Sequence, residues 1–245
     1  PSMAELPKPS DGFVRGVLNE GLVQQQRIGV NPFKVGFIGS TDTHLGTPGL
    51  VDEKDYKGHG GSGAPAGEKI PPGLTDNLEY NPGGLAVLWA EENSREAIYA
   101  AFRRKETFAT SGPRIKLRFF AGFDLEIDSL NSHNALQLAY EKAVSMGSEL
   151  LVQGPNSPEF LVWAAQDATS AKLQRLQVIK GWLQDGKSQE KVFDVACSDG
   201  GRVDPLEHRC PDNGARVNQA TCGISQGLGA GELTALWRDP EYDPA

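Results

Sequence analysis

The sequence predicts an α/β region followed by a β-rich region, and three observations support this fold class. An amphipathic segment at residues 11–28 precedes a short apolar run at residues 35–38, an order typical of α/β barrels and layered α/β domains. A second apolar run at residues 85–89 leads into a second amphipathic segment. From Ile115 onward, apolar and charged residues alternate, which is typical of half-buried strands.

Length and composition limit the domain organisation and the class of partner. The 245 residues fit one large or two small domains, and 38% hydrophobic residues are enough for a core. We place the boundary where the pattern changes, giving an α/β domain at 1–114 and a β-rich, sandwich-like domain at 115–245. A net charge of -8 argues against nucleic-acid binding, which favours a basic surface. No apolar run is long enough for a transmembrane helix.

Local signals define the helices of the first region. Ser10 is a suitable N-cap for a helix at about 11–28, and Gly29 a suitable stop. After the strand at 85–89, Asn93 and Glu96 form a capping-box pattern at the start of a second helix. Both helices have one apolar face at helical spacing, so each is expected to pack on a sheet.

The second region contains several strand signals and one hairpin. An Asp-Gly pair between two alternating segments is the chemistry expected of a tight β-turn. A helix is also compatible with the Ala- and Leu-containing stretch at 134–146. The expected strands lie at 107–109, 115–119 and 160–165, with hairpin strands at 176–182 and 191–197 around Asp185-Gly186.

Asp42 and His44 are the candidate metal ligands. They follow the apolar run at 35–38 and are separated by one residue, so in an extended segment their side chains point the same way. A carboxylate oxygen and an imidazole nitrogen are natural ligands for zinc, manganese or iron. The alternative is structural, because Asp at a strand-to-helix turn is often an N-cap.

The sequence around this motif is similar to the last metal-binding motif of the PHP (polymerase and histidinol phosphatase) superfamily. More narrowly, it resembles a large bacterial PHP-like family catalogued only as a domain of unknown function. The similarity spans most of the chain. It rests on three blocks: residues 31–44, residues 89–96 together with 109–115, and residues 176–182.

The resemblance implies a fold and a chemistry. Residues 1–114 would be the carboxyl-terminal part of a distorted TIM-like α/β barrel that binds divalent metal ions. The family's first metal motif, a His-x-His, has no counterpart among His44, His59, His133 and His208. The resemblance therefore implies a portion of a larger enzyme with further ligands upstream. Most members of that family carry the features of exported proteins, so the resemblance implies a periplasmic or extracellular location.

Four further residues are candidate substrate or phosphate contacts. Arg114, in a turn after a strand, offers a forked donor suited to phosphate, although Arg in a turn is often a surface residue. His59 lies in a Gly-rich stretch and is either an auxiliary acid or a solvated side chain. Glu91 and Glu92 follow the strand at 85–89 and either reach a metal, water or substrate, or stabilise the helix amino terminus.

Cys197, Cys210 and Cys222 lie in a turn-rich segment. Three cysteines allow one disulfide and leave one over, without defining which two pair. The alternative interpretation is a zinc site, but the spacings between these cysteines match no common pattern of zinc ligands. We favour a disulfide that closes a loop in an oxidising compartment.

Two functions from different classes follow. The first is a metal-dependent hydrolase of phosphoesters or related esters, acting through metal-activated water on a small-molecule substrate, with the full ligand set completed by the parent protein. The second is a non-catalytic binding or structural fragment whose β-rich domain recognises a partner or a glycan. Exposed sheet edges in a partial barrel would favour a homo-oligomer or association with the amino-terminal part.

Overall fold

The computed structural model describes residues 13–40, 84–125, 134–151, 156–218, 220–221 and 223–243. Asp42, His44, His59 and Cys222 lie outside these ranges. The described chain is a mixed α/β structure in which every paired strand is antiparallel to its neighbour. No helix in these ranges is both long and apolar enough to cross a bilayer.

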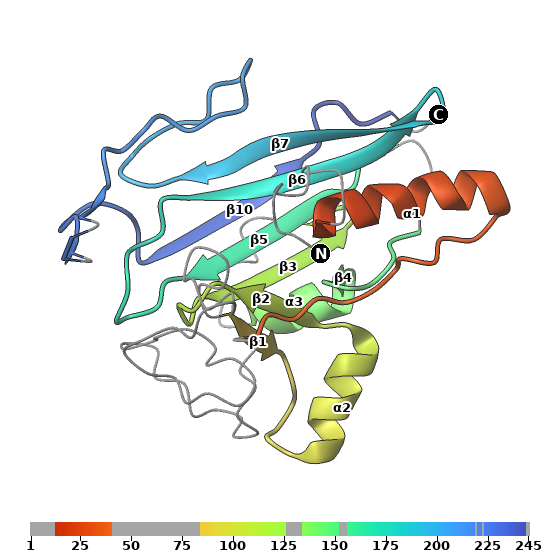
Figure 1. Cartoon of the computed structure of the whole chain (residues 1–245), viewed down its shortest axis with the longest axis horizontal. Coiled ribbons are helices and arrows are strands. Elements are labelled where there is room, and N and C mark those ends of the chain that lie inside the picture. The colour runs from red at the N-terminus through yellow and green to blue at the C-terminus, as the bar shows by residue number, and fades with distance from the viewer. Residues whose placement is uncertain are drawn as a thin grey trace, which may run out of the picture.

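A four-stranded sheet forms the centre of the molecule (Figure 1). Its order is β10-β5-β3-β4. The strands are β3 (Lys116–Gly122), β4 (Ala143–Ser145), β5 (Glu159–Ala165) and β10 (Glu232–Arg238). The strands expected at 115–119 and 160–165 are confirmed as β3 and β5.

One face of this sheet packs against a long hairpin. The hairpin consists of β6 (Arg175–Gln184) and β7 (Lys187–Cys197), joined at Asp185 and Gly186 with φ of 52° and 72°. Two successive positive φ values are what a tight hairpin turn requires, so the Asp-Gly prediction is confirmed. A buried cluster links Val162, Ala164, Leu173 and Leu176, with Leu117, Phe119, Val178 and Val195 packed against it.

The opposite face carries α3 (Ala135–Lys142), which confirms the helix expected within 134–146. Phe120, Ala139 and Leu161 form a second buried cluster between α3 and the sheet. Successive side chains of a strand point to opposite faces, so Leu161 faces α3 while Val162 faces the hairpin. In the described part of residues 115–243, antiparallel strands thus predominate.

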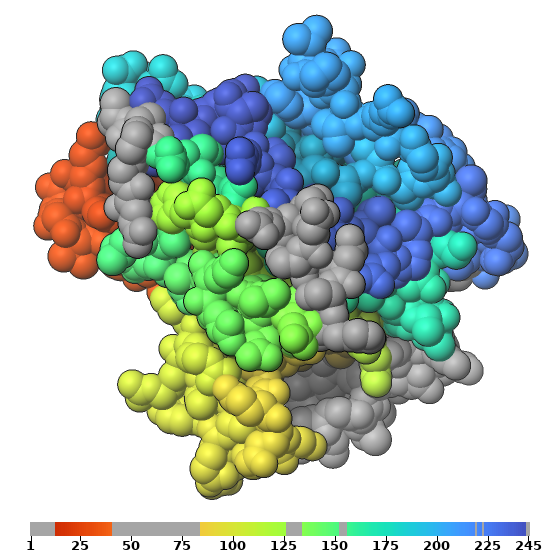
Figure 2. Space-filling view, turned by 180° about the vertical axis from the view of Figure 1, so that it is seen from behind, coloured from red at the N-terminus to blue at the C-terminus, as the bar shows by residue number. Residues whose placement is uncertain are grey.

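A smaller unit lies beside the central sheet. It contains β1 (Leu85–Leu88), α2 (Arg95–Arg104) and β2 (Thr107–Thr110), with β1 and β2 paired antiparallel. Ser94, not Asn93, is the N-cap of α2, and its hydroxyl accepts from the amide of Ala97 at 3.2 Å. Figure 2 shows this yellow segment as a lobe at one end of the molecule.

The amino-terminal helix α1 (Val14–Ile28) packs on the carboxyl-terminal hairpin (Figure 1). Arg15 forms an ion pair with Glu190 of β7, and the side chain of Asn19 lies against Gly181 of β6. Gly29 ends the helix with φ of 79°, as predicted, whereas the N-cap is Phe13 instead of Ser10. A short ladder of β8 (Val217–Asn218) and β9 (Gly223–Ile224) completes the described elements.

The structure corrects the expected strand at 35–38 and the barrel to which it was assigned. Within the described ranges these residues form no strand and no barrel is present. Val35 donates to Phe33 O at 2.9 Å, and Lys105 Nζ donates to Lys34 O at 3.2 Å, so a local turn and a side chain provide these backbone contacts. A TIM-like barrel needs parallel strands, whereas the pairing here is antiparallel.

Candidate functional site

The chain that leads to the Asp-x-His motif is held against one end of the β1–β2 pair. The amide of Gly84 donates to Ser40 O at 3.0 Å. A Cβ on Gly39 would lie 2.9 Å from Leu85 O, and a Cβ on Gly84 would lie 2.8 Å from Ser40 O. Both glycines are therefore needed for this close backbone approach. It places Ser40 where β1 begins and β2 ends.

Arg114 belongs to the same end of the β1–β2 pair, because it follows the last residue of β2, Thr110, after a short turn. Its amide donates to Asp167 Oδ2 at 2.8 Å. The other oxygen of Asp167 accepts from the amide and hydroxyl of Thr169 at 2.8 and 2.9 Å. These hydrogen bonds, first that from Arg114, lower the pKa of Asp167. The turn that carries Arg114 is thus fixed to the loop after β5.

Glu91 and Glu92 lie at the other end of the pair, beyond the last residue of β1. Leu85 pairs with Thr110 and Leu88 with Thr107, so the antiparallel arrangement puts the two ends of the pair about 10 Å apart by strand rise. Arg114 is therefore near the approach to the motif, and the two glutamates are not. Parallel strands would have brought all of these carboxyl ends together.

A pocket of about 470 Å³ occupies the Glu91 end of the pair. Its buried carboxylate is Glu106, only 3% exposed. Arg104 Nη2 lies 3.4 Å from Glu106 Oε2, and Arg118 Nη1 lies 3.7 Å from Glu106 Oε1. The lining residues are Trp89, Ala90, Glu91, Arg104, Glu106, Arg118, Tyr140 and Ser145.

Backbone contacts fix the carboxylate at the base of this pocket. Lys105 adopts the left-handed conformation, with φ of 59°, at the end of α2, and the Glu106 amide then donates to Ala101 O at 3.1 Å. The Trp89 amide donates to Glu106 O at 3.1 Å, while its indole donates to Leu117 O at 2.8 Å. The pocket is therefore held by α2, both strands of the pair and β3.

Tyr140 of α3 completes the pocket. Its hydroxyl donates to Glu106 and accepts from Arg118. Burial and the hydrogen bond to Glu106 raise the pKa of Tyr140 to about 12. Sequence reasoning missed Glu106, Arg118 and Tyr140, because each looks like an ordinary polar residue of its own element. Only the tertiary structure identifies them as parts of one site, because it brings them together from β3, α3 and the end of α2.

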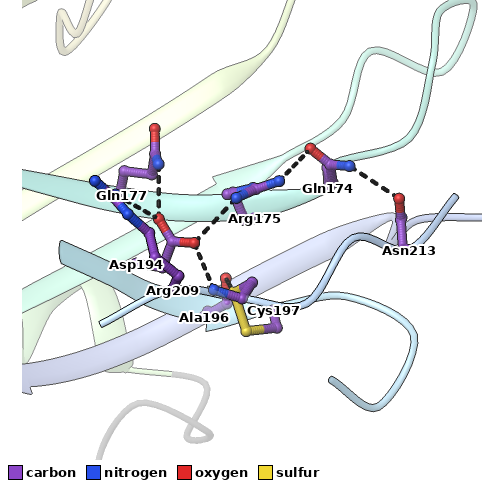
Figure 3. Close-up of polar contacts among 9 residues, drawn as sticks. Gln174, Arg175, Gln177, Asp194, Ala196, Cys197, Arg209 and Asn213 are labelled. Atoms are coloured by element: carbon purple, nitrogen blue, oxygen red, sulfur yellow. Dashed lines mark hydrogen bonds and ion pairs between the residues drawn. A yellow bond between two sulfur atoms is a disulfide. The ribbon is translucent and has the colours of Figure 1, made fainter. Parts of the chain in front are cut away.

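A second buried polar cluster surrounds Asp194 of β7 (Figure 3). Its carboxylate accepts from the Cys210 amide at 2.6 Å and from Gln177 Nε2 at 2.6 Å. Arg175 lies 3.1 Å away and Arg209 3.5 Å away. Burial raises the pKa of Asp194, but the hydrogen bonds from Cys210, Gln177 and Arg175 outweigh it, and the net pKa is lowered.

Beside this carboxylate, Cys197 and Cys210 form a disulfide with a Cα–Cα distance of 5.6 Å (Figure 3). The expectation of a loop-closing disulfide is confirmed, and the pair that the sequence left open is now defined. A disulfide indicates an oxidising compartment. Among the described residues, no group of three or more His, Cys, Asp or Glu side chains could hold a metal ion.

The fold and the disulfide define a mixed α/β protein with antiparallel sheets and a covalently closed loop beside its long hairpin. A family model described as "Protein of unknown function (DUF3604)" matches residues 2–245. The chain therefore belongs to the DUF3604 family. No curated protein and no solved structure matches it.

Proposed function

We propose that this chain carries part of the active site of a metal-dependent hydrolase of phosphoesters or related esters. Asp42 and His44 would be metal ligands, and Arg114 a phosphate contact. One structural relationship carries the proposal: Ser40, two residues before Asp42, is hydrogen-bonded at the end of β2 from which the Arg114 turn departs. The similarity of residues 31–44 to the PHP metal motif supports the same assignment.

The two proposed ligands suit a metal-dependent hydrolase. A carboxylate oxygen and an imidazole nitrogen suit manganese, zinc or iron, and catalytic sites use three or more protein ligands, so other residues must complete the set. A metal ion bound there would supply a Lewis acid for a phosphoryl oxygen and a bound water of lowered pKa. Arg114 would orient the substrate through paired N–H donors on two phosphate oxygens. The disulfide and the family resemblance support a periplasmic or extracellular location.

The alternative is a non-catalytic chain whose β-rich region recognises a partner or a glycan. One feature favours it, a hollow of about 80 Å³ beside α3 that is lined by Trp163, Glu232 and Leu136, among others. An aromatic ring next to a carboxylate offers a ligand both an apolar face and a hydrogen-bond acceptor. This reading requires no metal at Asp42 and His44.

Metal content separates the two functions. The purified chain is reconstituted with manganese, zinc or iron, dialysed, and analysed by elemental mass spectrometry beside the Asp42→Ala/His44→Ala double variant. We expect about one bound metal ion per chain in the native sequence and its loss in the double variant. Asp185→Asn, which changes a carboxylate in the exposed hairpin turn, is the control and should keep the metal. Equal metal in the double variant would refute the assignment of Asp42 and His44, whereas a chain without metal would show that these two ligands alone do not hold the ion.

A second variant tests the structural relationship itself. Gly84→Ala places a methyl group 2.8 Å from Ser40 O and must displace the segment that leads to Asp42. We expect weaker metal binding, measured by titration, with both proposed ligands still present. Gly231→Ala is the control, because Gly231 has no positive φ and a Cβ there meets nothing within 4 Å. Unchanged metal affinity in Gly84→Ala would show that the Ser40–Gly84 contact does not position the motif.

A further inference from the structure

The pocket around Glu106 has unequal charge at its base and at its mouth. Arg104 and Arg118 face the single buried carboxylate of Glu106, so the inner groups carry one net positive charge. Glu91 balances it only from outside. Its side chain is 69% exposed and lies 3.1 Å from Arg104 Nη2. An ion pair at such an exposed position is weak and easily exchanged.

Arg118 presents donors that the described protein does not use. Its Nη1 donates to the Tyr140 hydroxyl, but Nε and Nη2 donate to no acceptor of the described residues. The guanidinium carbon lies 3.5 Å above the centre of the Trp89 ring, which holds the group by a stacked cation–π contact. The side chain is 15% exposed, so it is largely enclosed but open to the pocket. The Arg118 guanidinium is therefore held in place, and it keeps N–H donors that no described residue accepts.

We infer that this pocket binds a small organic anion, a carboxylate or a phosphate monoester, with its oxyanion held between Arg104 and Arg118. The planar guanidinium fork matches the paired oxygens of either group. The ligand takes the place of the Glu91 carboxylate on Arg104, so Glu91 competes with it. The Trp89 and Tyr140 rings provide the apolar wall for the organic part.

This site is separate from the proposed metal site. It lies at the Trp89 end of β1, whereas Ser40 contacts Gly84 at the opposite end. Its ligands are positively charged groups, and no metal ion is needed to hold an anion there. Anion binding in this pocket is therefore independent of the proposed hydrolase activity.

The test is calorimetric titration of the whole chain, freed of metal ions on a chelating resin, with benzoate and, separately, with phenyl phosphate. We expect saturable binding of at least one, and the tighter of the two identifies the natural oxyanion. Arg118→Gln should weaken binding at least about tenfold, because it removes the charge and the fork. Glu91→Gln should strengthen it about two- to fivefold, because it removes the competing carboxylate from Arg104.

Arg216→Gln is the matched control. Arg216 is an exposed arginine that pairs with Asp212 at 2.6 Å away from the pocket, so the affinity should not change. If Arg118→Gln does not fold, the surface variant Glu91→Gln still tests the inference, because it should raise the affinity for the probe instead of lowering it. Lack of saturable binding of both probes, or no gain in affinity in Glu91→Gln, would overturn the inference.

Discussion

The carboxylate of Asp194 accepts a hydrogen bond of 2.6 Å from the backbone amide of Cys210, a half-cystine of the disulfide. One buried side chain on β7 thereby holds the far end of the covalently closed loop. Arg175 and Gln177 on β6 bind the same carboxylate, so the hairpin and the loop share one polar centre.

Replacing Asp194 by Asn should lower the free energy of unfolding by about 3 kcal/mol, because a buried ion pair that loses one partner leaves the other uncompensated. Urea denaturation measures the change. Asp212→Asn is the control, since Asp212 pairs with Arg216 at an exposed position and should have little effect. Equal losses in the two variants would show that burial of Asp194 is not responsible.

Asp194 also contributes a pH dependence whose sign is defined. Its pKa in the folded protein is lower than in the unfolded chain, where the pKa of Asp is about 3.9. Its stabilising contribution is therefore complete above that value and is lost as the pH falls through the lowered pKa. The free energy of unfolding of the native protein should fall more steeply in acid than that of Asp194→Asn. Parallel acid profiles would contradict this assignment.

Removal of the disulfide should destabilise the chain. Cys197 and Cys210 are 13 residues apart. Opening a loop of that length increases the entropy of the unfolded chain and stabilises the unfolded state by about 3 kcal/mol. We expect Cys197→Ser/Cys210→Ser to unfold at lower urea concentration than the native protein under non-reducing conditions. In reducing buffer the difference between the two proteins should disappear. A difference that persists there would indicate that the serines themselves disturb the fold.

Gly147 should not tolerate a side chain. Its φ is +81°, and a Cβ would lie 2.2 Å from Lys105 O, so Gly147→Ala combines backbone strain with a backbone clash. We expect a loss of about 3 kcal/mol in the free energy of unfolding. Gly200 has a similar φ of +71° and open space around it, so Gly200→Ala isolates the backbone term of about 1 kcal/mol. Similar losses of unfolding free energy in the two variants would show that the backbone near Lys105 moves aside at little cost.

Tyr140 should titrate later than an unperturbed phenol. Burial and the hydrogen bond to Glu106 raise its pKa to about 12, against about 10 for an unperturbed phenol. Its contribution to stability is complete below the unfolded value and is lost as the pH rises through the folded value. Near-ultraviolet absorbance should show a late tyrosinate step that Tyr140→Phe removes. A late step that survives in this variant would belong to another residue.

Much of the fold follows from local sequence. The helical period of residues 11–28 predicted α1, and Gly29 predicted its end. The Asp185-Gly186 pair predicted the hairpin, because few residue types adopt the positive φ values of that turn. The apolar run at 35–38 failed as a strand because hydrophobicity alone does not provide a partner for backbone hydrogen bonds.

The candidate sites were less accessible from the sequence. Arg114 and Glu91 both follow strands and looked equivalent, yet antiparallel pairing of β1 and β2 places them at opposite ends. Asp42 and His44 stay a prediction, as do His59, Cys222 and the boundary between residues 114 and 115. The disulfide was expected, but its pairing depended on which cysteine the Asp194 cluster brings beside Cys197.

The sequence by itself determined the periodic elements and the hairpin turn, because these depend on neighbouring residues and on their φ preferences. It favoured a loop-closing disulfide over a zinc site without defining the pair. The tertiary structure alone decided the direction of β1 against β2 and the meeting of Glu106, Arg118 and Tyr140 in one pocket. Those outcomes depend on contacts between residues far apart in the chain. Their free energy comes from packing and from pairing of buried charges, which no local pattern encodes.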